Sequence, residues 1–92
     1  MEFGGWDLSE LKGCNLPQKV ASAFIAATDG VVGASYEPVL YVGKKLVNGV
    51  NYCILAAQTL ATADASKRLV KMIINEAPNG TVKMVSIKKV EL

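Results

Sequence analysis

Two long runs of strand-forming residues flank the dipeptide Asn48-Gly49, and this arrangement most constrains how the chain folds. The first run covers Tyr36–Val47 and the second Val50–Leu60. Asparagine and glycine both tolerate the positive φ that a tight primed turn requires, so the pattern predicts a β-hairpin. Its tip carries the apolar pair Leu46-Val47. Hairpin tips in solvent are usually polar, so an apolar tip indicates a partner or a cover.

Composition favours a single globular domain over residues 1–92, because 51% of the chain is hydrophobic and 20% is charged. The net charge is +2, and the lysines are spread along the sequence. We therefore expect no nucleic-acid binding, since that requires a dense basic surface. No apolar run is long enough to cross a bilayer, so we also expect no membrane partner.

The chain contains no histidine, which removes the commonest general base and metal ligand. Its two cysteines, Cys14 and Cys53, do not form a close-spaced metal pair. We expect two reduced thiols, and a disulfide between them is the alternative if the fold brings them together. Four acidic residues lie in predicted turns or at predicted strand ends, which is typical of a solvated surface: Asp29, Glu37, Asp64 and Glu76. We expect no enzymatic activity, no cofactor and no metal.

Residues 1–13 are expected to form an N-terminal arm with a possible short first strand. Gly4-Gly5 give this arm a flexible point where backbone can lie close to a partner. The first residues lack the basic and apolar regions of a signal peptide. This predicts a cytoplasmic protein, or a secreted one if a leader has been removed.

One helix is expected to begin at Asn15 as N-cap, with Pro17 in the first turn and Gln18 completing a capping box. It should end at Asp29-Gly30, with Gly30 as a left-handed cap. Four apolar residues at helical spacing form its core stripe: Val20, Ala23, Phe24 and Ala27.

In the first long strand, Leu40 and Val42 are expected to face the helix, and Pro38 indicates an edge strand, a strand start or a bulge. The second strand alternates between two faces that are both apolar. One face holds Tyr52, Ile54 and Ala56, and the other holds Cys53, Leu55 and Ala57.

Two further strands are expected around a second strong turn, Ala77–Gly80. The strand before it alternates from Lys67 to Ile74, and the strand after it covers Thr81–Val90 with a bulge near Met84-Val85. The result is an α+β domain in which a single helix packs across a curved, four- to five-stranded antiparallel sheet. Alternate connections of such a meander fall at one end, so the two strong turns should lie together.

The first hairpin resembles that of the cystatin and stefin family, whose motif is Gln-x-Val-x-Gly, commonly followed by x-Asn-Tyr. Val47, Gly49, Asn51 and Tyr52 match this motif, and Lys45 stands where glutamine is expected. The glycine arm, the single helix and the order of the strands also fit. The chain is most similar to stefins, which lack the C-terminal disulfides of secreted cystatins, and to small bacterial cystatin-like proteins.

The resemblance implies a reversible inhibitor of papain-like cysteine proteases, in which the arm and two hairpins form a wedge that enters the active-site cleft. Carried over by position, the protease-binding residues are Gly4, Gly5, Lys45, Leu46, Val47, Asn48, Gly49, Pro78 and Asn79. The second hairpin has Pro78-Asn79 where those family members that carry a Pro-Trp pair have tryptophan.

An alternative is a non-inhibitory cystatin-like module that binds another protein, or itself, through the Cys53, Leu55 and Ala57 face. Either a monomer or a dimer is compatible with the sequence. The dimer would form by exchange of the first hairpin or by face-to-face packing. An enzyme of the cystatin-like superfold is disfavoured, since histidine is absent.

Overall fold

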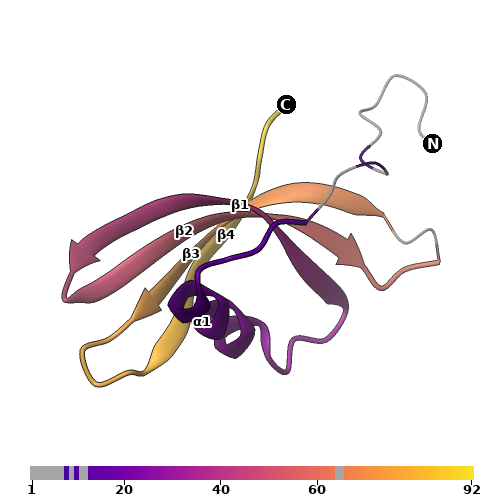
Figure 1. The fold of residues 1–92 in the computed structure, drawn as a ribbon. Coiled ribbons are helices and arrows are strands. Elements are labelled where there is room, and N and C mark those ends of the chain that lie inside the picture. The colour runs from indigo at the N-terminus through magenta and orange to yellow at the C-terminus, as the bar shows by residue number, and fades with distance from the viewer. Residues whose placement is uncertain (1–7, 9, 11–12, 64–65) are drawn as a thin grey trace.

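The computed structural model describes residues 8, 10, 13–63 and 66–92. The elements are helix α1 (Gln18–Thr28) and strands β1 (Ala34–Val47), β2 (Gly49–Leu60), β3 (Lys67–Glu76) and β4 (Val82–Lys89). The strands form one antiparallel sheet in the order β1-β2-β3-β4, and α1 lies across one of its faces (Figure 1). The predicted α+β meander is confirmed. The proposed short first strand falls mostly outside the described residues.

Helix α1 begins later than the capping pattern predicts. Its N-cap is Pro17, with φ −52° and ψ 146° and no side-chain cap hydrogen bond, so the Asn15 cap and the Gln18 capping box are wrong. A proline pushes the residue before it out of the helical region, and the helix therefore cannot include Leu16. At the other end Gly30 has a φ of +77°, the left-handed conformation expected after a helix.

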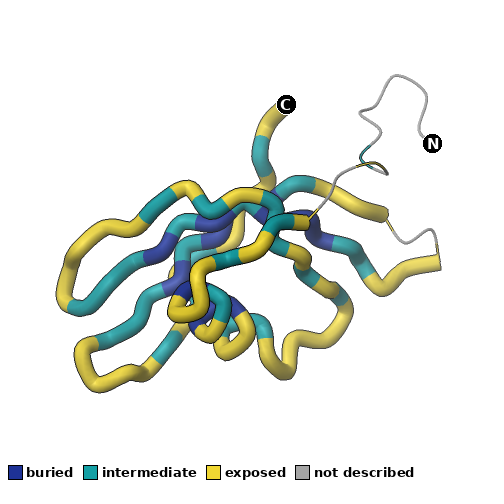
Figure 2. The backbone as a smooth tube through the Cα atoms, in the orientation of Figure 1, coloured by how far each residue is buried: buried dark blue, intermediate teal, exposed yellow. Residues whose placement is uncertain are grey.

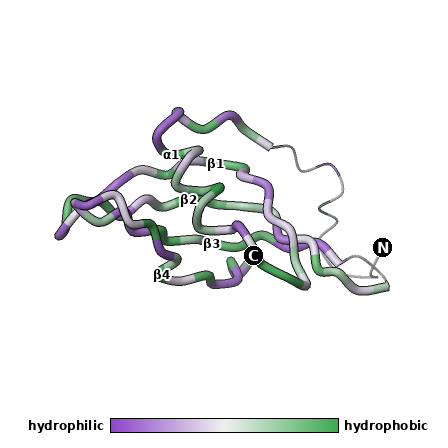
Figure 3. The backbone as a smooth tube through the Cα atoms, turned by 90° about the horizontal axis from the view of Figure 1, so that it is seen from below, coloured by the Kyte–Doolittle hydropathy of each residue, from purple (hydrophilic) through white to green (hydrophobic). Residues whose placement is uncertain are grey.

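The core lies between α1 and the middle of the sheet. Val20, Ala23 and Phe24 are buried on the helix, as its stripe predicts, and Ala27 packs beside them. On the sheet, Ile54, Met72 and Ile74 have no exposed surface. Most of the buried segments in Figure 2 lie where the helix faces the strands. In Figure 3, seen from the helix side, hydrophobic stretches follow β2 and β3.

Strand β1 contains two irregularities, where the ladder to β2 skips Val39 and then Val42. Pro38 adjoins the first, and β1 is an edge strand, as the proline predicts. The expectation that Leu40 and Val42 face the helix is wrong, because they are 52% and 57% exposed. Each extra residue changes which face the following side chains occupy, so Tyr41 packs against the core instead.

The bulge predicted in the last strand is confirmed. The β3–β4 ladder pairs Ile74 with Met84 and Ile73 with Ser86, and Val85 is left without a partner in the ladder. This places Met84 against the core and leaves Val85 51% exposed.

The two faces of β2 alternate as predicted. Tyr52, Ile54 and Ala56 are buried on the inner face, which we define as the face that α1 covers. The opposite face, called the outer face below, carries Cys53, Leu55 and the buried Ala57.

The inner face also holds a polar cluster far from the β1–β2 turn. The Gln58 side chain, only 6% exposed, donates from Nε2 to the Tyr36 hydroxyl at 2.9 Å. Its Oε1 accepts from Arg68 Nε at 2.5 Å. The three residues stand side by side on β1, β2 and β3. Among the described residues, no buried side-chain polar atom lacks a hydrogen-bond partner.

Candidate functional site at the hairpin end

The β1–β2 and β3–β4 turns lie together at one end of the sheet, as the meander predicts (Figure 1). Gly49 lies directly against the end of β3. A Cβ on Gly49 would overlap the carbonyl oxygen of Glu76 and would lie 3.0 Å from Cα of Ala77. Gly49 also has a φ of +95°, so only glycine fits here without strain. The close approach of two backbones therefore fixes the turns relative to each other.

The first turn is tighter than a two-residue primed turn. The ladder pairs Val47 with Gly49, so Asn48 alone separates the paired residues. The tip is apolar and open to solvent: Leu46 is 77% exposed and Val47 is 45% exposed. Leu46 pairs with Val50 on the inner side, and Val47 lies on the outer side. The tip therefore offers one aliphatic side chain to each side.

The second turn is held by its own polar groups. The Gly80 N–H donates to the Ala77 carbonyl at 2.8 Å, and the Ala77 N–H donates to the Thr81 carbonyl at 2.8 Å. The Asn79 Oδ1 accepts from the Thr81 N–H at 3.0 Å. Pro78 is exposed at the turn. The Asn79 side chain therefore stabilises the turn.

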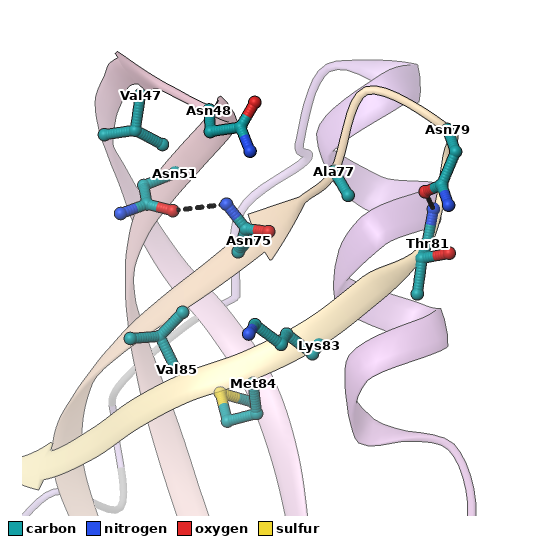
Figure 4. A pocket seen from close by; sticks show the side chains of 10 residues that line it. All are labelled: Val47, Asn48, Asn51, Asn75, Ala77, Asn79, Thr81, Lys83, Met84 and Val85. Atoms are coloured by element: carbon teal, nitrogen blue, oxygen red, sulfur yellow. Dashed lines mark hydrogen bonds between the residues drawn. The ribbon is translucent and has the colours of Figure 1, made fainter.

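An open groove of about 780 Å³ lies between the two turns (Figure 4). Three of the predicted site residues line it, namely Val47, Asn48 and Asn79. The other lining residues were not singled out as site residues: Asn51, Asn75, Ala77, Thr81, Lys83, Met84 and Val85. Lys45, Leu46, Gly49 and Pro78 lie in or beside the two turns without lining the groove. Gly4 and Gly5 fall outside the described residues.

A polar row crosses the outer face beneath this end of the sheet. The register places Lys45, Asn51, Asn75 and Lys83 side by side on the four strands. Asn75 Nδ2 donates to Asn51 Oδ1 at 2.8 Å. Asn51 on β2 is thus bonded to the neighbouring strand β3. The sequence does carry a signal for this pair: when the alternating apolar residues of β2 and β3 are aligned as antiparallel strands, Asn51 falls opposite Asn75.

On the inner face, Tyr52 connects the core to the hairpin end. The residue is 3% exposed, as expected of a core position. Its hydroxyl donates to Glu76 Oε1 at 2.8 Å. Burial, together with the hydrogen bond and negative charge of Glu76, raises the pKa of Tyr52 to about 12. The hydroxyl therefore stays protonated and keeps donating throughout the physiological range.

The described residues contain no group of three or more His, Cys, Asp and Glu side chains placed to hold a metal ion. Cys14 and Cys53 are both free thiols. Within that same part of the chain, no helix is long and apolar enough to cross a membrane. What the hairpin end presents is an apolar tip, amide groups and a lysine around an open groove.

Comparison of the chain with models of known protein families, with curated proteins and with solved structures finds no match.

Proposed function

We propose that this chain is a binding protein that inhibits papain-like cysteine proteases reversibly through its hairpin end, and that it is not an enzyme. The first hairpin would enter the active-site cleft, with the second hairpin beside it and the glycine arm of Gly4 and Gly5 completing the wedge. The observation that carries this proposal is the fixed pairing of the two turns around an exposed apolar tip.

Preorganisation supports the proposal. Gly49 packs against the backbone of Glu76 and Ala77, so binding does not have to order one turn relative to the other. In the proposed wedge, the fixed turn would enter the cleft without presenting a scissile peptide bond in a cleavable pose.

The apolar tip would supply much of the affinity. Leu46 is 77% exposed, and burying a leucine side chain contributes about 2 kcal/mol. Val47 would contribute less, because only 45% of its surface is exposed and available for burial. Lys45 would lie near the rim of the cleft, where acidic residues favour it through charge complementarity.

Titration of papain with the purified protein tests the proposal. The informative variant is Leu46→Ser combined with Val47→Ser, because both side chains are exposed and neither contributes to the core. We expect this pair to weaken inhibition by roughly 10- to 100-fold while the fold stays intact. A truncation that removes residues 1–5 tests the glycine arm separately.

Val32→Ser is the matched control. Val32 is a 93% exposed apolar residue in the α1–β1 connection, at the end of β1 opposite the hairpin tip. It should leave inhibition unchanged. If the folded wild-type protein does not inhibit papain at high micromolar concentration, or if Val32→Ser weakens inhibition as much as the tip variant does, the wedge proposal is wrong.

A further inference from the structure

The outer face gathers lysines that are scattered in the sequence. The strand register places five of them there, at Lys45, Lys67, Lys71, Lys83 and Lys88, all exposed. Among the described strand residues, Glu37 is the one acidic residue on this face, and its carboxylate lies beside Gly13. The other described charges balance one another: Lys19, Lys44, Arg68 and Lys89 against Glu10, Asp29, Glu76 and Glu91. The net positive charge of the described part of the chain is therefore concentrated on the outer face of the sheet.

Aliphatic side chains stand between these lysines. Leu40, Val42 and Val85 are each more than half exposed on or beside the outer face, where the bulges of β1 and β4 turn them outward. Leu55 pairs with Leu40 and is half-buried. The face therefore combines ammonium groups with aliphatic side chains.

Two of the lysines oppose each other directly. Lys71 on β3 pairs with Lys88 on β4, so like charges occupy one cross-strand position. Such pairs destabilise a sheet, and nothing in the fold requires lysine at both places. An external anion layer would remove the repulsion.

We propose that the outer face docks on an anionic lipid bilayer, with the lysines at the headgroups and the exposed aliphatic side chains inserted between them. A bilayer supplies a dense layer of negative charge and an apolar interior close beneath it. The sequence predicts no membrane partner because no apolar run is long enough to span a bilayer. Docking on the bilayer surface does not require a spanning segment.

Other occupants fit this face less well. Protein interfaces are enriched in aromatic residues and arginine and are depleted in lysine. The outer-face positions of the described strands contain neither aromatic residues nor arginine. Sites for single-stranded nucleic acid use aromatic stacking, which is likewise missing from this face. A second copy packed face to face would oppose five lysines to five more.

Co-sedimentation with phosphatidylcholine vesicles, with and without phosphatidylserine, tests the proposal. We expect binding that requires phosphatidylserine and weakens at high salt. Each lysine near such a surface strengthens binding roughly fivefold, so Lys71→Gln with Lys88→Gln should weaken it roughly 25-fold. Leu40→Ser should weaken it roughly tenfold more. The control pair Lys19→Gln with Lys44→Gln removes equal charge from the helix and the inner face and should change binding less than threefold.

A second readout separates docking from a structural effect. Removal of one lysine of the opposed pair by Lys88→Gln should raise stability to denaturant slightly while weakening vesicle binding, because relief of repulsion acts in the folded protein alone. The proposal is overturned if phosphatidylserine vesicles bind no better than phosphatidylcholine vesicles, or if the control pair weakens binding equally. It is also overturned if duplex DNA binds as tightly as the vesicles and Leu40→Ser affects neither.

Discussion

The hydroxyl of Tyr52 donates a hydrogen bond of 2.8 Å to Oε1 of Glu76, and this bond joins the buried core to the end of the sheet where the two turns meet. Glu76 is the last residue of β3, and its carbonyl oxygen is the atom that Gly49 packs against. One residue therefore anchors the turn region twice, through its side chain to β2 and through its backbone to the first turn.

The stability of the protein should fall as the pH rises from about 10 to about 12. The pKa of Tyr52 is about 12 in the folded protein and about 10 in the unfolded chain. Over this range the unfolded chain loses the proton and the folded protein keeps it, so the free energy of unfolding decreases with pH. Below about pH 10 both states are protonated and this contribution is constant.

Denaturant unfolding of the wild type and of Tyr52→Phe across this range measures the effect. The decline should be shallower in Tyr52→Phe, because the variant has no proton to lose at this position. Glu76→Gln should lower the pKa of Tyr52, since it removes the negative charge that opposes ionisation. Parallel declines in the wild type and Tyr52→Phe would contradict the assignment.

Gly49→Ala should destabilise the protein by about 2 to 4 kcal/mol, because an alanine there combines an unfavourable φ of +95° with overlap on the Glu76 carbonyl. Gly80→Ala is the matched control. Gly80 has a φ of +90°, but a Cβ there meets nothing within 4 Å, so only the backbone penalty of about 1 kcal/mol applies. Urea denaturation of both variants gives the comparison. Equal losses would mean that the two turns are not packed as described.

Gln58→Ala should cost about 1 to 3 kcal/mol of stability. It removes the partner of both the Tyr36 hydroxyl and the Arg68 guanidinium at a position that is 6% exposed. Gln18→Ala, at an exposed helical position, should change the free energy of unfolding by less than about 0.5 kcal/mol. Thermal unfolding of the two variants provides the measurement, and a Gln58→Ala protein as stable as Gln18→Ala would argue against the polar cluster.

Asn51 and Asn75 should couple energetically. Their side-chain hydrogen bond of 2.8 Å predicts a coupling energy of about 1 kcal/mol in a double-mutant cycle of Asn51→Ala and Asn75→Ala. The same variants, titrated against papain, show whether the amide pair that lines the groove matters for inhibition. Strictly additive losses of stability would place the two amides out of contact.

The strand order and the inner face of β2 were predictable because their signals are local. Period-two alternation from Tyr52 to Ala57 fixes the faces, and the Asn48 and Pro78 turns fix the connections. The phase of β1 was not predictable from alternation, since two extra residues at Val39 and Val42 change the face within one strand. The helix start is not predictable from the cap residue alone, because Asn15 is a favourable N-cap but Pro17 restricts Leu16 to non-helical backbone and moves the start to Gln18.

The residues that line the groove were predictable from the sequence where they belong to a turn, and were not where they come together through strand register. Val47, Asn48 and Asn79 belong to turns and were named, whereas Asn51, Asn75 and Lys83 come together only through the pairing of three strands. The clustering of the outer-face lysines was not predictable from the sequence for the same reason. They are far apart in the chain, and only the sheet places them on one surface.

The bulges of the sheet also bear on how the protein behaves at high concentration. They lie in β1 and β4, which are the two edge strands of the sheet formed by the described residues. Beside the first bulge, the Cys14 N–H donates a hydrogen bond of 2.8 Å to the Pro38 carbonyl, so this acceptor is not available to another strand. An incoming strand would therefore meet an interrupted row of donors and acceptors on either side, which disfavours growth of sheets from chain to chain. The same irregularities that make the phase of β1 unpredictable from its sequence are thus expected to make the folded protein a poor template for fibres.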